Sequence, residues 1–257
     1  MMDSSFVIYW GRSLQDTYNY GSVVRFKQNE VHFSNPQLSP GFKMHSWSSQ
    51  NDFVDGALWE NLPLLKSGTE YQVVIDAQIK PANSVHIQLD FFDESNELID
   101  EQIFADQNFR FTVPMHTKRY QISLVSLNNQ EMIFKNMTIN PTFNDFEITV
   151  QTSGTKRVII KPLNGKARTI EIILRDRFLE SGSYIGANNQ LTVYFEYNGR
   201  HKYSVETLST ECWQALQDVV LDWDAYDVQV KTIGVSSQLL MALQGEIAKK
   251  LMKKGEH

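Results

Sequence analysis

Two serines near the C-terminal end come closest to a catalytic arrangement in this sequence. A predicted strand at 227–233 leads into Ser236 and Ser237 and then into a predicted helix, which is the setting of the nucleophile in α/β-hydrolases. That motif needs a second glycine where this chain has Gln238. Its acid and histidine also follow the serine, and His257 is the only histidine downstream. We therefore interpret the serines as a helix cap and predict no catalytic residue.

A group of carboxylates between residues 90 and 106 has the ligand type that calcium prefers. A helix–loop–helix calcium loop starting at Asp93 would need a glycine at its sixth position, and the chain has Leu98 there. We interpret these acids as the solvated rim of a hairpin and predict no metal, with a cation at Asp93 and Glu97 as the alternative. The acids are Asp90, Asp93, Glu94, Glu97, Asp100, Glu101 and Asp106.

The other reactive side chains lack the spacing that chemistry requires. Cys212 has no histidine close to it along the chain and borders Trp213, so it is interpreted as a small buried residue. The six histidines show no metal-binding spacing, and neither a Walker loop nor a Gly-x-Gly-x-x-Gly motif is present. We therefore expect no cofactor and no enzymatic activity. A single cysteine cannot form an intramolecular disulfide, which favours a reducing compartment.

Several aromatic residues stand among Gly, Ser, Asn and Asp and outside apolar runs. Flat rings of this kind stack on the C–H faces of sugars while neighbouring polar side chains bind the hydroxyl groups. The equally open alternative is that they fill a core or a subunit contact. The candidates for sugar or partner contact are Tyr18, Tyr20, Trp47 and Trp59, with Asp16 as a polar orienting residue.

The first half of the chain predicts strands, because apolar and polar residues alternate there with a period of two. The alternation covers residues 71–79, 85–91, 109–113 and 120–124, and turn-forming sequences separate these segments. Short strands with no helical pattern between them are typical of an antiparallel sandwich. We predict a mainly β protein whose residues 1–142 form an antiparallel β-sandwich of the jelly-roll type.

The pattern changes after Asn140-Pro141-Thr142, which we take as the domain boundary. Strands are predicted at 147–150, 157–161, 169–174, 191–197 and 227–233. Apolar residues then recur with helical spacing from Trp213 to Trp223 and from Leu240 to Leu251, the second stretch ending in four lysines. Residues 143–257 are therefore predicted to form a smaller α+β region of unassigned role.

Charge and hydropathy exclude several functional classes. Residues 1–142 carry a net charge of −6, and the chain has no basic stripe, so we expect no nucleic-acid partner. No apolar run approaches the roughly 20 residues that cross a bilayer, and no signal-peptide pattern is visible. These features predict a cytoplasmic protein whose lysine-rich C-terminal helix makes at most peripheral membrane contact.

The opening block from Asp16 to Phe26, Asp-Thr-Tyr-Asn-Tyr-Gly-Ser-Val-Val-Arg-Phe, resembles one family in particular. It is similar to the third accessory Sec-system protein of Gram-positive bacteria that export serine-rich repeat adhesins. The resemblance covers about the first 140 residues. It continues through Pro40-Gly41, Ser46-Trp47-Ser48, Leu62-Pro63-Leu64-Leu65, Gly68, Tyr71, Pro81, Phe91-Phe92-Asp93, Phe111 to Pro114 and Tyr120.

The resemblance implies properties that the residues alone do not. Members of the family are cytosolic, have a fold similar to carbohydrate-binding modules, and form a complex with two companions. One companion is glycosyltransferase-like, and the other is an acetyltransferase of the α/β-hydrolase type that acts on adhesin sugars. The complex binds the glycosylated serine-rich preprotein and works with the accessory SecA motor ATPase at the membrane.

Three functional hypotheses follow. The first is a non-catalytic subunit that binds the glycosylated preprotein and supports its modification and export. The second is a pure scaffold whose exposed aromatic surface is covered by the companion subunits. The third is a carbohydrate-active hydrolase, which would need paired essential carboxylates such as Asp90 and Asp93.

Overall fold

In the computed structural model, the chain divides into two compact units, one of which contains a segment from late in the sequence. The first unit holds the described residues from 4 to 144 together with 181–185, and the second unit holds those from 146 to 176 and from 186 onward. The described residues are 4–11, 16–27, 30–49, 62–144, 146–151, 156–163, 167, 169–176, 181–186, 190–197, 204, 206–207, 210, 213–214, 217, 227–233, 241, 245–246 and 249.

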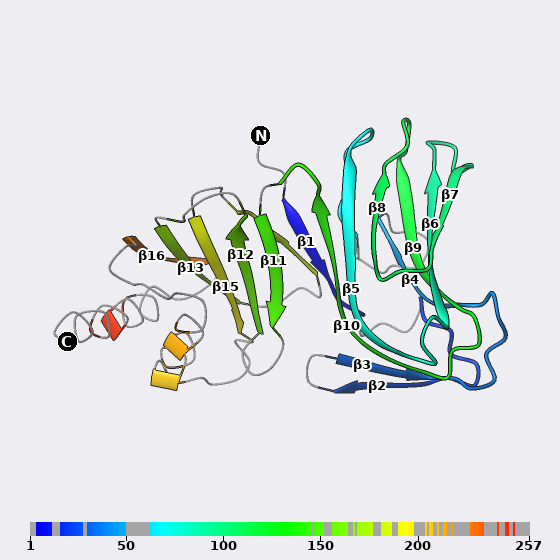
Figure 1. The fold of residues 1–257 in the computed structure, drawn as a ribbon, viewed down its shortest axis with the longest axis horizontal. Helices are drawn as coiled ribbons and strands as arrows, with labels where there is room; N and C mark the ends of the chain where they lie inside the picture. The colour runs from blue at the N-terminus through cyan, green and yellow to red at the C-terminus, as the bar shows by residue number, and fades with distance from the viewer. Residues whose placement is uncertain are drawn as a thin grey trace. The chain divides into compact units, whose positions relative to one another are not determined.

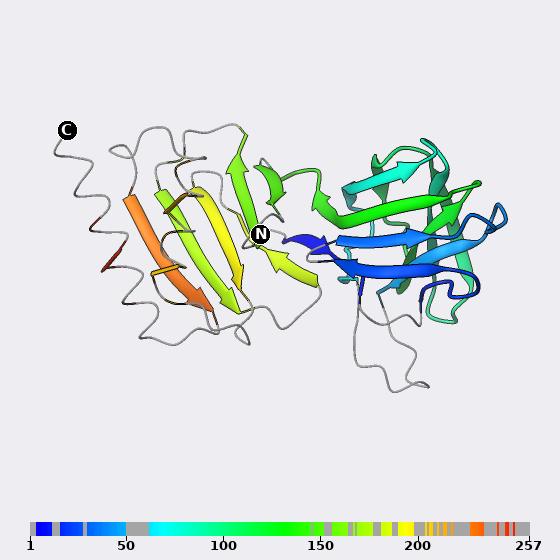
Figure 2. The same cartoon turned by 90° about the horizontal axis from the view of Figure 1, so that it is seen from below.

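The first unit is a sandwich of two antiparallel sheets (Figures 1 and 2). The seven-stranded sheet contains β1 (Ser5–Ile8), β2 (Val23–Lys27), β3 (Glu30–Ser34), β5 (Glu70–Lys80), β8 (Asn108–Thr112), β10 (Glu131–Pro141) and β14 (Ser181–Tyr184). The four-stranded sheet has the order β4 (Lys43–Ser48), β9 (Arg119–Ser126), β6 (Val85–Phe92) and β7 (Leu98–Phe104). The prediction of a mainly β protein with an antiparallel sandwich is confirmed, and so are the four strands predicted from alternation.

Strand β10 organises the seven-stranded sheet. It pairs with β5 along one side, while β3 and then β1 share its other side. The register with β5 shifts at Lys135, where one extra residue forms a bulge between Phe134 and Asn136. The ammonium group of Lys135 lies 3.1 Å from a carboxylate oxygen of Asp76 on β5. A bulge of this kind bends the strand and increases its local twist.

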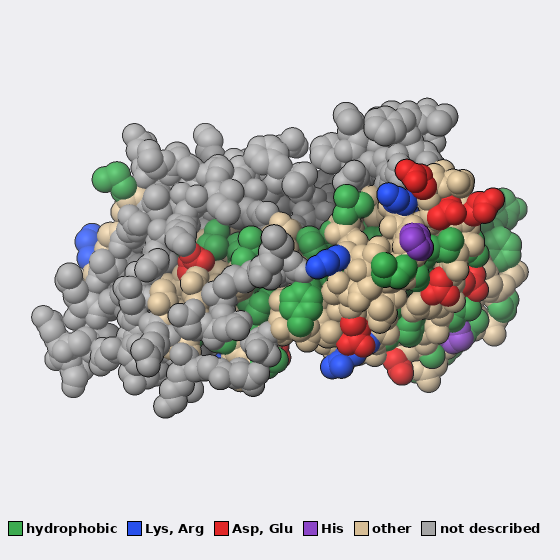
Figure 3. Space-filling view, turned by 90° about the horizontal axis from the view of Figure 1, so that it is seen from above, with side chains coloured by type: hydrophobic (Ala, Val, Ile, Leu, Met, Phe, Trp, Pro, Cys, Tyr) green, Lys and Arg blue, Asp and Glu red, His purple; other side chains and the backbone are tan. Residues whose placement is uncertain are grey.

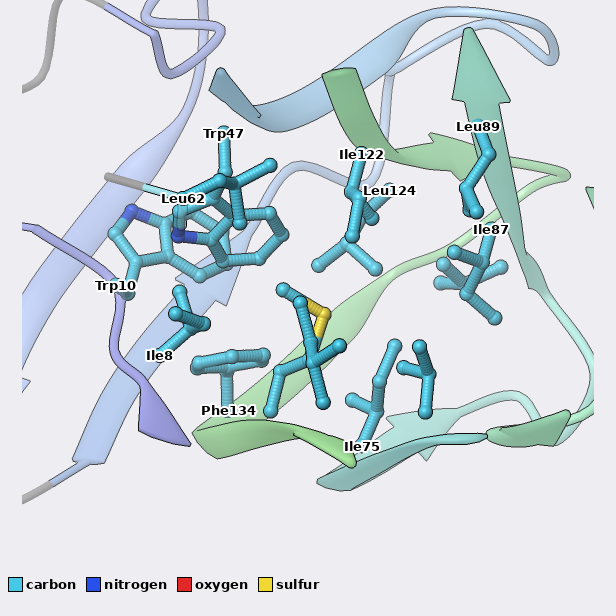
Figure 4. Close-up of a cluster of buried hydrophobic side chains, with 14 of the residues drawn as sticks. Ile8, Trp10, Trp47, Leu62, Ile75, Ile87, Leu89, Ile122, Leu124 and Phe134 are labelled. Atoms are coloured by element: carbon cyan, nitrogen blue, oxygen red, sulfur yellow. The ribbon is translucent and has the colours of Figure 1, made fainter. Parts of the chain in front are cut away.

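The core lies between the two sheets and is rich in aromatic rings (Figure 4). Trp47 on β4 has no exposed surface, and its ring centroid lies 5.3 Å from that of Phe134 and 6.1 Å from that of Trp10. The indole N–H of Trp47 donates a hydrogen bond of 3.0 Å to the carbonyl oxygen of Tyr9. Its polar atom is therefore satisfied inside the core, as a buried indole requires.

The second unit is built on a five-stranded mixed sheet (Figure 1). Its order is β11 (Phe146–Gln151), β12 (Lys156–Pro162), β15 (Gln190–Tyr197), β13 (Thr169–Asp176) and β16 (Asp227–Ile233). All five strands predicted for this half are present. β13 runs parallel to both β15 and β16, whereas β12 is antiparallel to its neighbours.

Helical backbone follows β15 and β16, as the α+β prediction requires. The described residues between 206 and 217 and between 241 and 249 are helical. Most of the predicted apolar helix positions lie outside the described residues.

We expect Trp47→Ala to lower the free energy of unfolding of the first unit by about 3–5 kcal/mol, because it removes a buried indole and leaves a cavity. Tyr20→Ala is the matched control, since the Tyr20 side chain is 85% exposed, and it should change stability by no more than about 0.5 kcal/mol. Urea titrations followed by circular dichroism measure both. Equal losses in the two variants would contradict the assigned core.

Candidate functional site

The outer face of the four-stranded sheet carries many polar side chains, with the apolar Val125 and Ile103 among them. Across the strands, Ser46 lies opposite Ser123, and Ser123 lies opposite Gln88. One step along, Gln121 lies opposite Asp90. Because the intervening residues of these strands, such as Trp47, point into the core, these polar residues all point to the other side of the sheet. We call this surface the polar face; it comprises Lys43, Ser46, Ser48, His86, Gln88, Asp90, Glu101, Gln121 and Ser123.

A hydrogen-bonded network centred on Asp90 fixes the polar face. Asp90 is only 4% exposed, and its two carboxylate oxygens accept hydrogen bonds of 2.8 Å from the Lys43 ammonium and from the Gln88 amide. The same Gln88 amide nitrogen donates to Glu101 at 3.0 Å. A buried carboxylate is stable only when it is paired and hydrogen-bonded in this way. The network therefore fixes the positions of the amide and carboxylate groups, and the charges of Lys43 and Asp90 neutralise each other.

The segment around Thr17 extends the polar face beyond β4. The backbone N–H of Tyr18 donates to the Met44 carbonyl, and the N–H of Ser46 donates to the Asp16 carbonyl, both at 2.9 Å. Thr17 pairs with His45 and points into the core. The half-buried ring of Tyr18 packs against the same core, and Asp16 is exposed. Partial burial raises the pKa of the Asp16 carboxyl above its ordinary value.

Aromatic rings stand at both ends of the polar face. Near Lys43, the rings of Tyr18 and Phe42 meet edge to face with centroids 5.4 Å apart. At the other end, the Arg119 guanidinium lies 3.9 Å from the centre of the Phe92 ring. Along β9 these ends are separated by about 20 Å, at roughly 3.4 Å per residue. Hydroxyl-binding groups between ring systems are an arrangement suited to an extended, polyhydroxylated ligand.

Tyr20 lies on a turn that a buried asparagine holds in place. The Asn35 side-chain amide donates hydrogen bonds of 3.0 Å to the Tyr20 carbonyl and to the Ser22 hydroxyl. Gly21 has a φ of +70°, a left-handed conformation that glycine adopts without strain. Asn35 itself is 2% exposed. The buried Asn35 side chain therefore fixes the turn that presents the exposed Tyr20 ring.

The structure separates the five residues singled out from the sequence. Asp16 and Tyr18 lie beside the polar face, and Tyr20 is exposed two residues farther on. Trp47 lies in the core, which favours the structural interpretation for that residue. Trp59 lies outside the described residues.

The polar face was missed as a site, although the sequence contained its signal. Gln88 and Asp90 on β6 and Gln121 and Ser123 on β9 are the polar members of the alternation that predicted those strands. What the sequence does not show is that the two strands are neighbours, because that depends on the register of pairing.

A buried polar cluster underlies this part of the sheet. The imidazole of His45 stacks on Trp10 with centroids 4.2 Å apart, and its Nδ1 lies 2.8 Å from the Thr17 hydroxyl. The same hydroxyl accepts a 3.2 Å hydrogen bond from the Trp10 indole. Burial lowers the pKa of His45 to about 3, against a smaller opposing effect of a backbone hydrogen bond with Asp16. His45 is therefore neutral at physiological pH.

Many of the residues in the motifs noted above have structural roles. The Tyr120 hydroxyl donates a 2.7 Å hydrogen bond to the Pro63 carbonyl, and burial raises the pKa of this tyrosine well above its ordinary value. The N–H of Gly41, whose φ is +87°, donates to Ser126 at 2.8 Å. These contacts fix the loops before β4 and β5 onto the four-stranded sheet.

The acidic hairpin shows a structural use for one of its carboxylates. One oxygen of Asp93 accepts hydrogen bonds from the backbone N–H groups of Ser95 and Glu97, at 2.8 and 3.0 Å. No group of three or more His, Cys, Asp or Glu that could hold a metal ion occurs among the residues described. Cys212, Ser236 and Ser237 lie outside those residues. Within the same part of the chain, no helix has the length and hydropathy to span a membrane.

Comparison with known proteins decides the family. The family model described as "Accessory Sec secretory system ASP3" matches residues 17–141. The accessory Sec system protein Asp3 of Streptococcus gordonii is 31% identical over 137 residues, which cover 49% of this chain and 86% of that protein. The chain belongs to the accessory Sec system Asp3 family.

A further relative and two solved structures are also similar to this Asp3-family chain. Asp3 of Staphylococcus aureus is 23% identical over 158 residues, which are 62% of this chain, so the chain spans about half the length (50%) of that relative. A solved structure of accessory secretory proteins 1, 2 and 3 from Streptococcus pneumoniae matches with a TM-score of 0.50 and 29% identity, over 52% of this chain and 94% of the other. The Gap123 complex from Streptococcus agalactiae matches 96% of this chain and 76% of its own, with a TM-score of 0.54 and 19% identity, and so shares the fold.

The His45 environment predicts a specific pH dependence of stability. Since the pKa of His45 is about 3 in the folded chain and about 6.5 when unfolded, its contribution is complete above pH 6.5 and is lost as the pH falls. Between pH 7 and pH 4 this loss amounts to about 3 kcal/mol. We expect the stability advantage of the wild type over His45→Phe to shrink by that amount, measured by urea denaturation at each pH. A difference that does not change with pH would contradict the buried, neutral histidine.

Proposed function

We propose that this Asp3-family chain is a non-catalytic subunit of an accessory Sec complex that binds the glycosylated serine-rich repeat adhesin preprotein. In this proposal it works in the cytoplasm beside a glycosyltransferase-like and an acetyltransferase-like companion, and it delivers the preprotein to the accessory SecA motor ATPase. The observation that carries the sugar-binding part is the polar face, with its fixed amide and carboxylate groups and its aromatic ends. The solved assembly of accessory secretory proteins 1, 2 and 3 supports the complex.

The arrangement of the hydroxyl groups supports binding without catalysis. The Ser46 and Ser123 hydroxyls lie 2.9 Å apart and bond to each other. His45, the histidine on the same strand, points into the core towards Thr17. A serine nucleophile needs a base within hydrogen-bond reach. His45 is turned away from these hydroxyls, and in the described part of the chain their hydrogen bond is to each other rather than to His86.

A sugar fits the polar face because the face offers both kinds of contact that a sugar needs. The Gln88 amide nitrogen already donates to Asp90 and Glu101, so its carbonyl oxygen is the atom that can accept from a sugar hydroxyl, while the Gln121 amide can donate to one. The charge of Lys43 is balanced by Asp90, so the centre of the face favours a neutral ligand. The half-exposed ring of Phe42 offers an apolar surface for the C–H face of a sugar.

A scaffold without sugar binding is the second candidate, and one observation favours it. Three large side chains on loops of the first unit have most of their surface in contact with solvent. Exposed apolar groups of this kind often mark protein–protein contacts. They are Tyr20, Leu64 and Met115, which are 85%, 72% and 65% exposed.

We expect a serine-rich peptide carrying N-acetylglucosamine to bind the wild-type chain saturably in isothermal titration calorimetry. Gln88→Ala should weaken this binding about tenfold, because it removes the amide that orders Asp90 and Glu101 and that faces the ligand. Gln72→Ala is the matched control, since this glutamine bonds Asn108 on an exposed part of the seven-stranded sheet, and it should bind like the wild type.

The outcomes separate the two candidates. Absence of binding by the wild type, together with intact assembly of the three-protein complex, would favour the scaffold. Equal binding by Gln88→Ala and the wild type would indicate that the peptide binds at another surface.

A further inference from the structure

Strand β7 forms an open margin of the four-stranded sheet. Within the described part of the chain it is hydrogen-bonded to β6 alone. Every second residue of such a margin strand directs its N–H and C=O groups away from the sheet. The register with β6 shifts at Ile99 and is regular from Asp100 to Phe104. These five residues are a template on which another extended chain can pair.

Three other margins of the first unit differ from β7. β2 exposes the basic Arg25 and Lys27 beside Val23 and Phe26, and the exposed residues of β8 are all polar. The free side of β4 is occupied by the segment around Thr17. A covered or fully polar edge resists pairing with other chains, and the charge of the β2 edge is opposite in sign to that of β7.

β7 exposes three aliphatic side chains together with the acidic Glu101. Leu98, Ile99 and Ile103 are 53%, 41% and 57% exposed. Phe104 anchors the end of the strand by stacking on Phe109, with ring centroids 4.1 Å apart. A well-anchored strand with exposed aliphatic residues is suited to a specific contact.

The charge of the chain segment that contains β7 has one sign. Residues 93–106 contain six carboxylates and no Lys, Arg or His. Figure 3 shows Asp and Glu side chains beside hydrophobic ones at the right-hand end of the first unit. A second copy of the same strand would therefore bring carboxylates against carboxylates, which disfavours pairing between two copies.

We propose that β7 is the docking edge for an extended segment of a companion subunit, which adds to the four-stranded sheet as a further strand. That segment carries a basic residue beside Asp100 and an aliphatic residue beside Ile103. The charge complementarity favours this partner over a second copy. The inference rests on the membership of the three-protein complex proposed above, and it names the surface through which the chain joins that complex.

The test measures assembly of the chain with its two co-expressed companions. Asp100→Lys and Ile103→Lys should each weaken assembly at least tenfold in biolayer interferometry. The matched controls are Glu70→Lys on β5 and Val23→Lys on the β2 margin, both at exposed positions, and they should stay within twofold of the wild type. Asp100→Lys should still bind the glycosylated peptide, because Asp100 is not part of the polar face.

Hydrogen exchange of the wild-type chain gives a readout that does not depend on how the variants fold. Amide exchange in β7 should slow by at least tenfold on assembly, whereas exchange in β2 should not change. Unchanged exchange in β7, or normal assembly of both β7 variants, would overturn this inference alone. Failure of the wild type to assemble would overturn the proposed complex as well. If the wild type forms a homodimer that Ile103→Lys loses, the occupant of β7 is a second copy of this chain and not a companion subunit.

Discussion

The apolar layer between the two sheets fixes the direction of every other side chain in the sandwich. Because side chains alternate across a strand, burying Trp47, Ile122 and Leu89 forces their neighbours outward. A slip of one residue would turn Ser46 into the apolar core and Trp47 out of it, which costs far more than any single surface contact gains. The positions of the polar residues on the outer face are therefore a by-product of core packing.

Polar groups occur on both sides of this sheet, and they serve different ends. Beneath it, the Thr17 hydroxyl bonds Nδ1 of His45 within the core next to Trp10. Above it, Lys43 and Asp90 pair across the face where water and a ligand can reach their neighbours. Satisfied polar networks restrict side-chain freedom, so a ligand would meet groups that are already ordered and would lose less entropy on binding.

The strands that the sequence predicted share a regular alternation, and those it did not predict lack one. β5 and β8 alternate because one face is buried and the other is in water. Strand β4 has the sequence Lys43-Met-His-Ser-Trp-Ser48. It is buried at four central positions and carries two serines on its outer side, so its sequence resembles that of a polar loop that contains one tryptophan. This pattern explains why the sequence does not distinguish a sugar-contact role from a core role for Trp47. The proximity of Gln88 to Gln121, and the parallel pairing of β13 with β15 and β16, depend on contacts between distant segments and leave no local trace.

Strand β14 lies in the first unit although the chain on both sides of it belongs to the second. It pairs along the whole of β1, and its Tyr184 is fully buried. Dividing the gene at the apparent junction near Thr142 would thus yield a sandwich that lacks strand β14. An excised version needs residues 181–185 spliced back through a linker, or a permuted order of the chain, before its behaviour can be compared with that of the whole protein.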